Sequence, residues 1–142
     1  MSALSPDIAA KIRASFARQG LMASFGATLA RMEAGRVDIA ADVAPAFSQQ
    51  QGFAHAGMVF ALGDSAAGYA ALSVMPLEAE VLTVEMKINL MAPAAGRLLA
   101  AGRVLKAGRR LVIVAADVWS EGGDGARKQV AALQGTMIPV AA

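Results

Sequence analysis

Asp64 is the residue whose surroundings most need a chemical explanation. Between residues 56 and 77 it is the only charged residue, in a stretch rich in alanine, glycine and bulky apolar side chains. Burying an unpaired carboxylate is costly, so such a side chain must be hydrogen-bonded, protonated or used in a reaction. We weigh two roles for Asp64: a structural hydrogen bond to a neighbouring strand, or an acid, base or nucleophile.

Small residues lie shortly before Asp64, where an apolar helix would begin. Residues 52–57 read Gly-Phe-Ala-His-Ala-Gly, so Ala56 and Gly57 leave the backbone N–H groups of the first helical turn uncovered. Uncovered N–H groups at a helix N-terminus polarise a carbonyl or stabilise an oxyanion. His55 is the only histidine, and a histidine side chain can either make a structural hydrogen bond or transfer a proton. The spacing predicts a carbonyl-polarising turn followed by a carboxylate.

Other common catalytic arrangements are weak or missing. A Ser-His-Asp triad would combine His55 and Asp64 with Ser48 or Ser65, but the sequence has no G-x-S-x-G turn. One histidine without a spaced second ligand builds no metal site, and the absence of cysteine excludes thiol nucleophiles and disulfides. The glycine-rich nucleotide-binding motifs are also absent. We expect neither a metal nor a cofactor.

Composition places the chain among globular proteins. With 142 residues, 56% hydrophobic and 17% charged, it fits a single domain over residues 1–142 and is too apolar for disorder. A net charge of +2 without a basic block gives no support for nucleic-acid binding. Asp64 and the lack of basic flanks argue against a membrane span over residues 56–77, and residues 1–18 lack a targeting pattern. We expect a cytoplasmic protein that binds neither nucleic acid nor membrane.

The hydrophobic patterns predict which elements position these residues. We expect an N-terminal helix over residues 1–20, starting at Ser5-Pro6-Asp7, and a helix over about residues 56–75 that is buried nearly all round and closed by Pro76. Strand-like residues 25–43 are broken by a turn at 33–36, and further strands follow at about 81–90, 97–105, 111–120 and 128–138. In the strand 81–90, strict alternation predicts one face with Val81, Thr83, Glu85, Lys87 and Asn89.

Helices and strands are therefore segregated along the chain. This order favours an α+β protein whose antiparallel sheet wraps one long apolar helix, which is the hotdog fold.

Residue spacing around Asp64 resembles a known family. The run Gln49-x-x-Gly52-x-x-His55-Ala56-Gly57, with Asp64 nine residues after the histidine, resembles the hotdog acyl-CoA thioesterases of the phenylacetate-degradation (PaaI-like) type. The likeness continues at residues 82–86, 91–96 and 108–110 and spans about residues 25–140.

The resemblance implies a role for each matching residue. Asp64 matches the nucleophile or general base, and Ala56, followed by Gly57, matches the position whose backbone N–H polarises the thioester carbonyl. Gln49 matches a side chain that supports that carbonyl or the attacking water, and Thr83 matches a hydroxyl that positions water. The remaining match, His55, shapes the loop.

Two positions depart from the family pattern. Position 56 is usually glycine, and Ala56 narrows the approach to its amide. One turn beyond the acid, where some relatives carry a hydroxyl, this chain has Gly68.

The resemblance implies hydrolysis of a small or medium-chain acyl-CoA thioester, aryl or aliphatic, to the free acid and CoA. Arg109 and Arg110 are candidates to bind the CoA phosphates, although ordinary solvated turn charges would look the same. Two alternatives stay open. One is a hotdog hydratase or dehydratase. The other is a non-catalytic acyl-CoA-binding dimer, which stays open because Ala56 stands where the family usually has glycine.

The distance between the two site elements predicts an assembly. Ala56 and Asp64 are eight residues apart, about 12 Å along a helix at ~1.5 Å per residue, too far to act on one carbonyl. If both act on one substrate, they come from different subunits, which predicts a homodimer with shared active sites. The resemblance implies the same dimer, paired again into a homotetramer.

Overall fold

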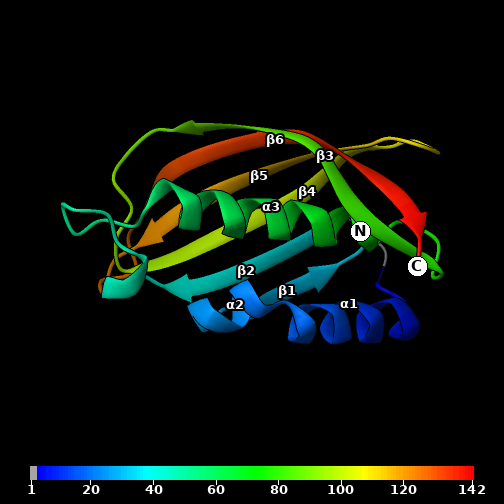
Figure 1. The fold of residues 1–142 in the computed structure, drawn as a ribbon, viewed down its shortest axis with the longest axis horizontal. Coiled ribbons are helices and arrows are strands. Elements are labelled where there is room, and N and C mark those ends of the chain that lie inside the picture. The colour runs from blue at the N-terminus through cyan, green and yellow to red at the C-terminus, as the bar shows by residue number, and fades with distance from the viewer. Residues whose placement is uncertain (1–2) are drawn as a thin grey trace.

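The computed structural model describes residues 3–142 and shows one antiparallel sheet curved around one long helix (Figure 1). Residues 1 and 2, which the predicted helical segment 1–20 and domain 1–142 include, lie outside the described residues. The strand order in the sheet is β1-β2-β4-β5-β6-β3, and every neighbouring pair is antiparallel. In chain order the elements are α1 (Pro6–Arg18), α2 (Gly20–Phe25), β1 (Thr28–Glu33), β2 (Arg36–Asp42), the 3₁₀ helix η1 (Pro45–Phe47), α3 (Ala56–Leu72), β3 (Ala79–Leu90), β4 (Arg97–Ala107), β5 (Val112–Glu121) and β6 (Arg127–Ala141). The predicted α+β hotdog fold is confirmed.

Helix α3 is the centre of the core. It packs against five of the six strands, β2 to β6, and most of its residues are buried. Small side chains allow this contact: Ala66 and Ala67 are fully buried, and β4 passes them at Gly102. A Cβ on Gly102 would lie 2.3 Å from the backbone carbonyl of Ala66, so only glycine fits there. The helix sits directly on the sheet because both surfaces lack bulk.

This close approach predicts the effect of one added methyl group. We expect Gly102→Ala to lower the free energy of unfolding by about 1–3 kcal/mol, because the added carbon forces β4 and α3 apart. Thermal and urea denaturation measure the change. Gly123→Ala, in a turn where a Cβ meets nothing within 4 Å, is the matched control. Equal stability of the two variants would contradict the packing argument.

The ends of two predicted elements need correction. Helix α3 stops at Leu72 rather than near residue 75, because Ser73 caps it: its Oγ donates to the Ala70 carbonyl at 2.6 Å. The first helix was predicted to end near Gly20 and strand-like sequence to begin near Phe25, but residues 20–25 form the separate helix α2. Phe25 ends α2 and is buried edge-on against Phe47, with ring centroids 4.8 Å apart. Apolar burial at Phe25 looked like strand alternation but belongs to a helix.

The strict alternation predicted for β3 is also wrong, because β3 contains a β-bulge. Thr83 pairs with Met137 and Glu85 with Thr136, so Val84 is an extra residue on this strand. Val81 and Thr83 therefore face α3, whereas Glu85, Lys87 and Asn89 line a hollow on the other face of the sheet. The bulge aims Thr83 toward the helix while Met86 and Ile88 still pack on the core.

Strand β3 is one edge of the sheet. It spans 12 residues and exposes Leu82, Val84 and Leu90, each more than half accessible. Within residues 3–142 no strand pairs with its other side, so a further strand can form hydrogen bonds there. Among residues 3–142 we find no helix that combines the length and apolar character needed to cross a membrane.

Candidate active site

The N-terminus of α3 is capped by His55. The histidine backbone is extended, with φ −60° and ψ 141°, and its Nδ1 accepts a hydrogen bond from the Gly57 N–H at 2.7 Å. A Cβ on Gly57 would lie 3.0 Å from that nitrogen, so glycine makes room for the cap. Gly57 thus uses its N–H inside the turn. The exposed N–H of Ala56 has no acceptor among residues 3–142, which leaves it as the donor for a ligand.

Gln49 holds the loop that leads into this turn. Its Oε1 accepts from the backbone N–H groups of Gln51 and Phe53, at 2.5 and 3.3 Å, and its own N–H donates to the Phe53 carbonyl. Among the described residues, the amide nitrogen Nε2 donates a hydrogen bond only to Gln51 Oε1, at 3.4 Å. Gln49 therefore braces the loop with its oxygen and keeps an amide donor near the start of α3.

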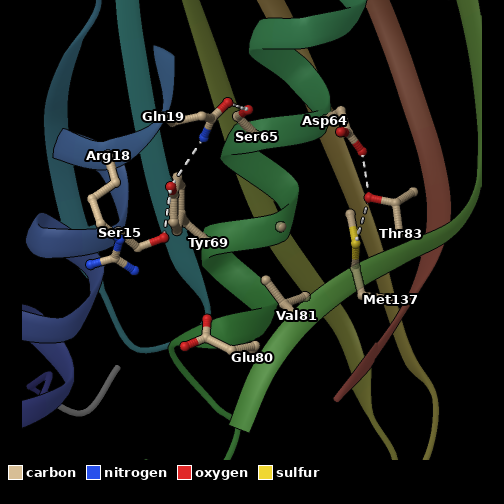
Figure 2. A pocket seen from close by; sticks show the side chains of 11 residues that line it. Ser15, Arg18, Gln19, Asp64, Ser65, Tyr69, Glu80, Val81, Thr83 and Met137 are labelled. Atoms are coloured by element: carbon tan, nitrogen blue, oxygen red, sulfur yellow. Dashed lines mark hydrogen bonds between the residues drawn. The ribbon is translucent and has the colours of Figure 1, made fainter. Parts of the chain in front are cut away.

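Asp64 lies two turns further along α3 and is half-buried. Thr83 Oγ1 on β3 donates a hydrogen bond to Asp64 Oδ1 at 2.8 Å, and the same hydroxyl lies 3.2 Å from the Met137 sulfur (Figure 2). Desolvation by burial raises the pKa of Asp64, and the bond from Thr83 partly opposes that rise. A carboxylate with a raised pKa, fixed in direction by one donor, is suited to accept a proton or attack a carbon.

The raised pKa of Asp64 predicts how a substitution of its partner Thr83 changes the pH dependence of kcat/KM. A base must be deprotonated, so kcat/KM should fall on the acid side as Asp64 becomes protonated. The hydrogen bond from Thr83 stabilises the charged form of Asp64 and lowers its pKa. We therefore expect Thr83→Val, which removes that bond, to move this acid limb to higher pH. Thr136→Val removes a hydroxyl that donates to Glu85 on the outer face and is the control. An acid limb that stays in place, or moves to lower pH, would contradict the assignment.

A cavity of about 370 Å³ lies beside Asp64, across the outer face of α3 (Figure 2). On the β3 side it is lined by Asp64 and Thr83. On the opposite side, side chains from α1 and from the α1–α2 junction meet the helix. The full lining is Ser15, Arg18, Gln19, Asp64, Ser65, Gly68, Tyr69, Glu80, Val81, Thr83 and Met137.

Part of this lining was not predicted from the sequence. Gln19, which joins α1 to α2, donates through Nε2 to the Tyr69 hydroxyl at 3.1 Å and accepts at Oε1 from Ser65 at 3.0 Å. Ser15 lies 3.1 Å from the same tyrosine hydroxyl. The signal was Tyr69, the one tyrosine of the chain, in a largely apolar helix, since a buried tyrosine hydroxyl needs a partner.

The predicted site residues fall into three groups. Gln49, His55, Ala56 and Gly57 gather at the start of α3, and Asp64 meets Thr83 at its middle. Arg109 and Arg110 lie in the exposed β4–β5 turn, at the opposite end of the sheet (Figure 1). β4 begins beside the loop that contacts Ala54, and its 11 residues span about 35 Å at roughly 3.3 Å each. Within one chain, the arginines are far from the helix N-terminus.

Among residues 3–142, no three His, Asp or Glu side chains gather in a way that would hold a metal ion.

Comparison with known proteins identifies the class. Residues 51–126, more than half of the chain, match the thioesterase superfamily. The solved structure of a thioesterase family protein from Silicibacter pomeroyi is 40% identical, covers 95% of this chain and 99% of that chain, and has a TM-score of 0.92. The chain therefore belongs to the thioesterase superfamily, and the protein is a thioester hydrolase. The family resemblance seen in the sequence is confirmed.

Other solved structures agree with the fold. A conserved protein from Pseudomonas aeruginosa, PA5202, is 30% identical over 86% of this chain and 94% of that chain, with a TM-score of 0.77. The PaaI protein of the phenylacetic acid degradation operon of E. coli is 18% identical, over 97% and 96% of the two chains, with a TM-score of 0.84. At that identity it supports the fold alone. A comparison with curated proteins gives no match.

Proposed function

We propose that this thioester hydrolase cleaves small or medium-chain acyl-CoA esters, aryl or aliphatic, to the free acid and CoA. The observation that carries the proposal is the half-buried Asp64 carboxylate, which accepts a hydrogen bond from Thr83 and faces a cavity, on a helix whose first N–H has no acceptor among the described residues. We further propose that the protein acts in the cytoplasm.

The chemistry assigns one task to each group. Ala56 N–H donates to the thioester oxygen and stabilises the negative charge that forms there. Asp64 either takes a proton from a water molecule that attacks the carbonyl carbon, or attacks that carbon itself. The C–S bond then breaks, the carbonyl reforms, and the sulfur leaves as the CoA thiolate, which takes up a proton. Where Asp64 is the nucleophile, this leaves an acyl–Asp64 anhydride, which a water molecule hydrolyses to the free acid and the Asp64 carboxylate. Gln49 Nε2 supports the carbonyl, and Thr83 holds the carboxylate in position.

Both groups act on one carbonyl only in an assembly. Eight residues of α3 separate Ala56 from Asp64, about 12 Å along the axis. Asp64 contacts Thr83 on the exposed edge strand β3, so a second chain added to that edge would come close to the carboxylate. We propose a homodimer with two shared sites, formed along β3, and a homotetramer built from two such dimers.

A panel of acyl-CoA esters, assayed with a thiol-reactive dye, tests the function. Release of free thiol supports hydrolysis. Loss of enoyl absorbance without thiol would instead make the protein a hydratase, and tight binding without either product would make it an acyl-CoA-binding dimer. His55 argues against the hydratase alternative, because Nδ1 of the neutral imidazole accepts the helix-cap hydrogen bond and Nε2 therefore carries the hydrogen, which leaves no ring nitrogen free to act as a base.

Arg109 and Arg110 give a separate prediction about CoA binding. If they bind CoA phosphates, replacing both by Ala should raise KM about tenfold with little change in kcat, because remote binding is largely uniform. Because the turn is far from Ala56 of its own chain, the arginines would serve a site that includes the other subunit. Steady-state kinetics at low salt measure the effect. An unchanged KM at low salt would mean that both arginines are ordinary solvated charges of the turn.

A further inference from the structure

The cavity beside Asp64 has two chemically different sides (Figure 2). One side holds Asp64 and its hydrogen-bond donor Thr83. The other side holds four uncharged polar side chains, Ser15, Gln19, Ser65 and Tyr69, that bond to one another and that we call the polar network. The proposed reaction uses the first side and assigns no task to the polar network.

Helix α3 forms the floor between the two sides. Asp64 and Gly68 are four residues apart and lie on one face of the helix, and Ser65 and Tyr69 form the neighbouring row. Gly68 contributes no side chain, and a Cβ there would meet only Met137 Cε, at 3.8 Å. At Gly63, by contrast, a Cβ would lie 2.8 Å from Leu133. A side chain at position 63 would therefore have to displace Leu133, whereas position 68 faces free space.

The polar network has hydrogen-bonding capacity beyond its internal bonds. Among the described residues, Gln19 Nε2 donates only to Tyr69, although an amide nitrogen carries two hydrogens. Ser65 Oγ donates to Gln19 and keeps its acceptor lone pairs. Of the Ser15 and Tyr69 hydroxyls, which share one bond, only one uses its hydrogen in that bond. The network can both donate to and accept from a guest without breaking apart.

Charge at the cavity points to an uncharged guest. Arg18 and Glu80 both line the cavity and have opposite signs, and within residues 3–142 neither makes an ion pair. The four members of the polar network carry no charge. A carboxylate at the far end of the guest would meet one cation, Arg18, and one anion, Glu80, in the same lining.

We propose that the cavity binds the acyl group and that the polar network recognises a hydroxyl or carbonyl at the end remote from the thioester. Gly68 supplies the space through which the acyl group passes from Asp64 to the network. A volume of about 370 Å³ is near the lower end for ligand pockets, which fits a short acyl group. This inference rests on the proposed function, because it takes Asp64 as the group next to the thioester.

Matched substrates test the recognition. Straight-chain acyl-CoA esters of four to eight carbons are compared with their terminal-hydroxyl counterparts and with the dicarboxylic monoesters of the same length. We expect kcat/KM about tenfold higher for at least one hydroxylated ester than for its plain counterpart, the size of one good hydrogen bond. Tyr69→Phe should remove most of that preference, measured as the ratio of kcat/KM for the hydroxylated ester to kcat/KM for its plain counterpart. Thr136→Val, on the outer face of the sheet, should leave that ratio unchanged.

The role of Gly68 is tested by how kcat/KM depends on the length of the acyl group. Gly68→Ala should lower at least tenfold the ratio of kcat/KM for the longest good substrate to kcat/KM for the shortest ester, because the methyl group enters the cavity. Its melting temperature should stay the same or rise, since alanine favours a helix and meets no neighbour closer than 3.8 Å. A general loss of activity at all lengths would contradict the size role.

The outcomes separate this inference from the function beneath it. If no ester releases thiol, the proposed function fails. If esters are hydrolysed but terminal hydroxyls bring no gain, or Tyr69→Phe lowers only the melting temperature, the polar network merely docks α1 and α2 on α3 and the inference fails. Preference for the dicarboxylic monoesters would also overturn it and would assign the recognition to Arg18.

Discussion

Asp64→Asn is expected to lower kcat for thioester hydrolysis at least 100-fold while the protein stays folded. A positioned general base or nucleophile contributes typically ~10²–10⁴-fold, and asparagine has nearly the same shape but can neither accept a proton nor attack. Thr83 can still donate to the asparagine Oδ1, so the local hydrogen bond survives. Steady-state kinetics with the best ester of the panel measure the loss.

Stability gives this prediction an independent control. The pKa of Asp64 is raised in the folded protein by burial, so the carboxyl favours folding below its unfolded pKa, and that contribution is lost as the pH rises through the raised value. At neutral pH the buried charge therefore lowers the free energy of unfolding. Asp64→Asn should melt at the same temperature as the wild type or higher at pH 7. More than a tenth of the activity in a folded variant would reject the catalytic assignment.

The fold was predictable because its strongest signals are local. The long apolar run that forms α3, with Pro76 after it, and the glycine-rich turns between strands define the element order, and that order restricts the architecture. Two features were not predictable from periodicity. The bulge at Val84 depends on how β3 pairs with β6, and α2 exists because Phe25 packs on Phe47, a residue distant in the sequence. In both places, tertiary contacts override the local sequence pattern.

Some residues of the candidate site were likewise predictable from the sequence, and others were not. Asp64 stands out in the sequence because a charge in an apolar helix needs a reason, and the cap at His55 follows from its position before the first turn. Gln19 and Ser15 could not be found, since nothing in the sequence of α1 shows which face meets Tyr69. Arg109 and Arg110 were selected by type alone, and their distance from Ala56 became visible only in three dimensions.

Two inactive variants, co-expressed in one cell, should restore activity if the active sites are shared. Asp64→Asn removes the acid, and Ala56→Pro removes the N–H that polarises the carbonyl, because proline has none. Each homodimer should be inactive. A heterodimer would contain one site with both defects and one site with neither, so its activity should return to about half of the wild-type value.

The structure makes Ala56→Pro a clean variant. Position 56 is the first residue of α3, where proline is tolerated, and the extended backbone of His55 suits a residue that precedes proline. Ala56 N–H bonds to no other described residue, so its removal costs no internal hydrogen bond. Ala56→Gly, which keeps the N–H, should remain active as the matched control, and circular dichroism should show every variant folded.

Differently tagged chains, purified through both tags in turn, isolate the mixed assemblies for assay. Recovered activity requires that Ala56 of one chain and Asp64 of another meet on one thioester, since neither parent can supply both groups. The roughly 12 Å that separates them along α3 is the physical reason for expecting this result. Folded heterodimers as inactive as their parents would mean that one chain completes each site, and that the thioester carbonyl is polarised by a donor other than Ala56.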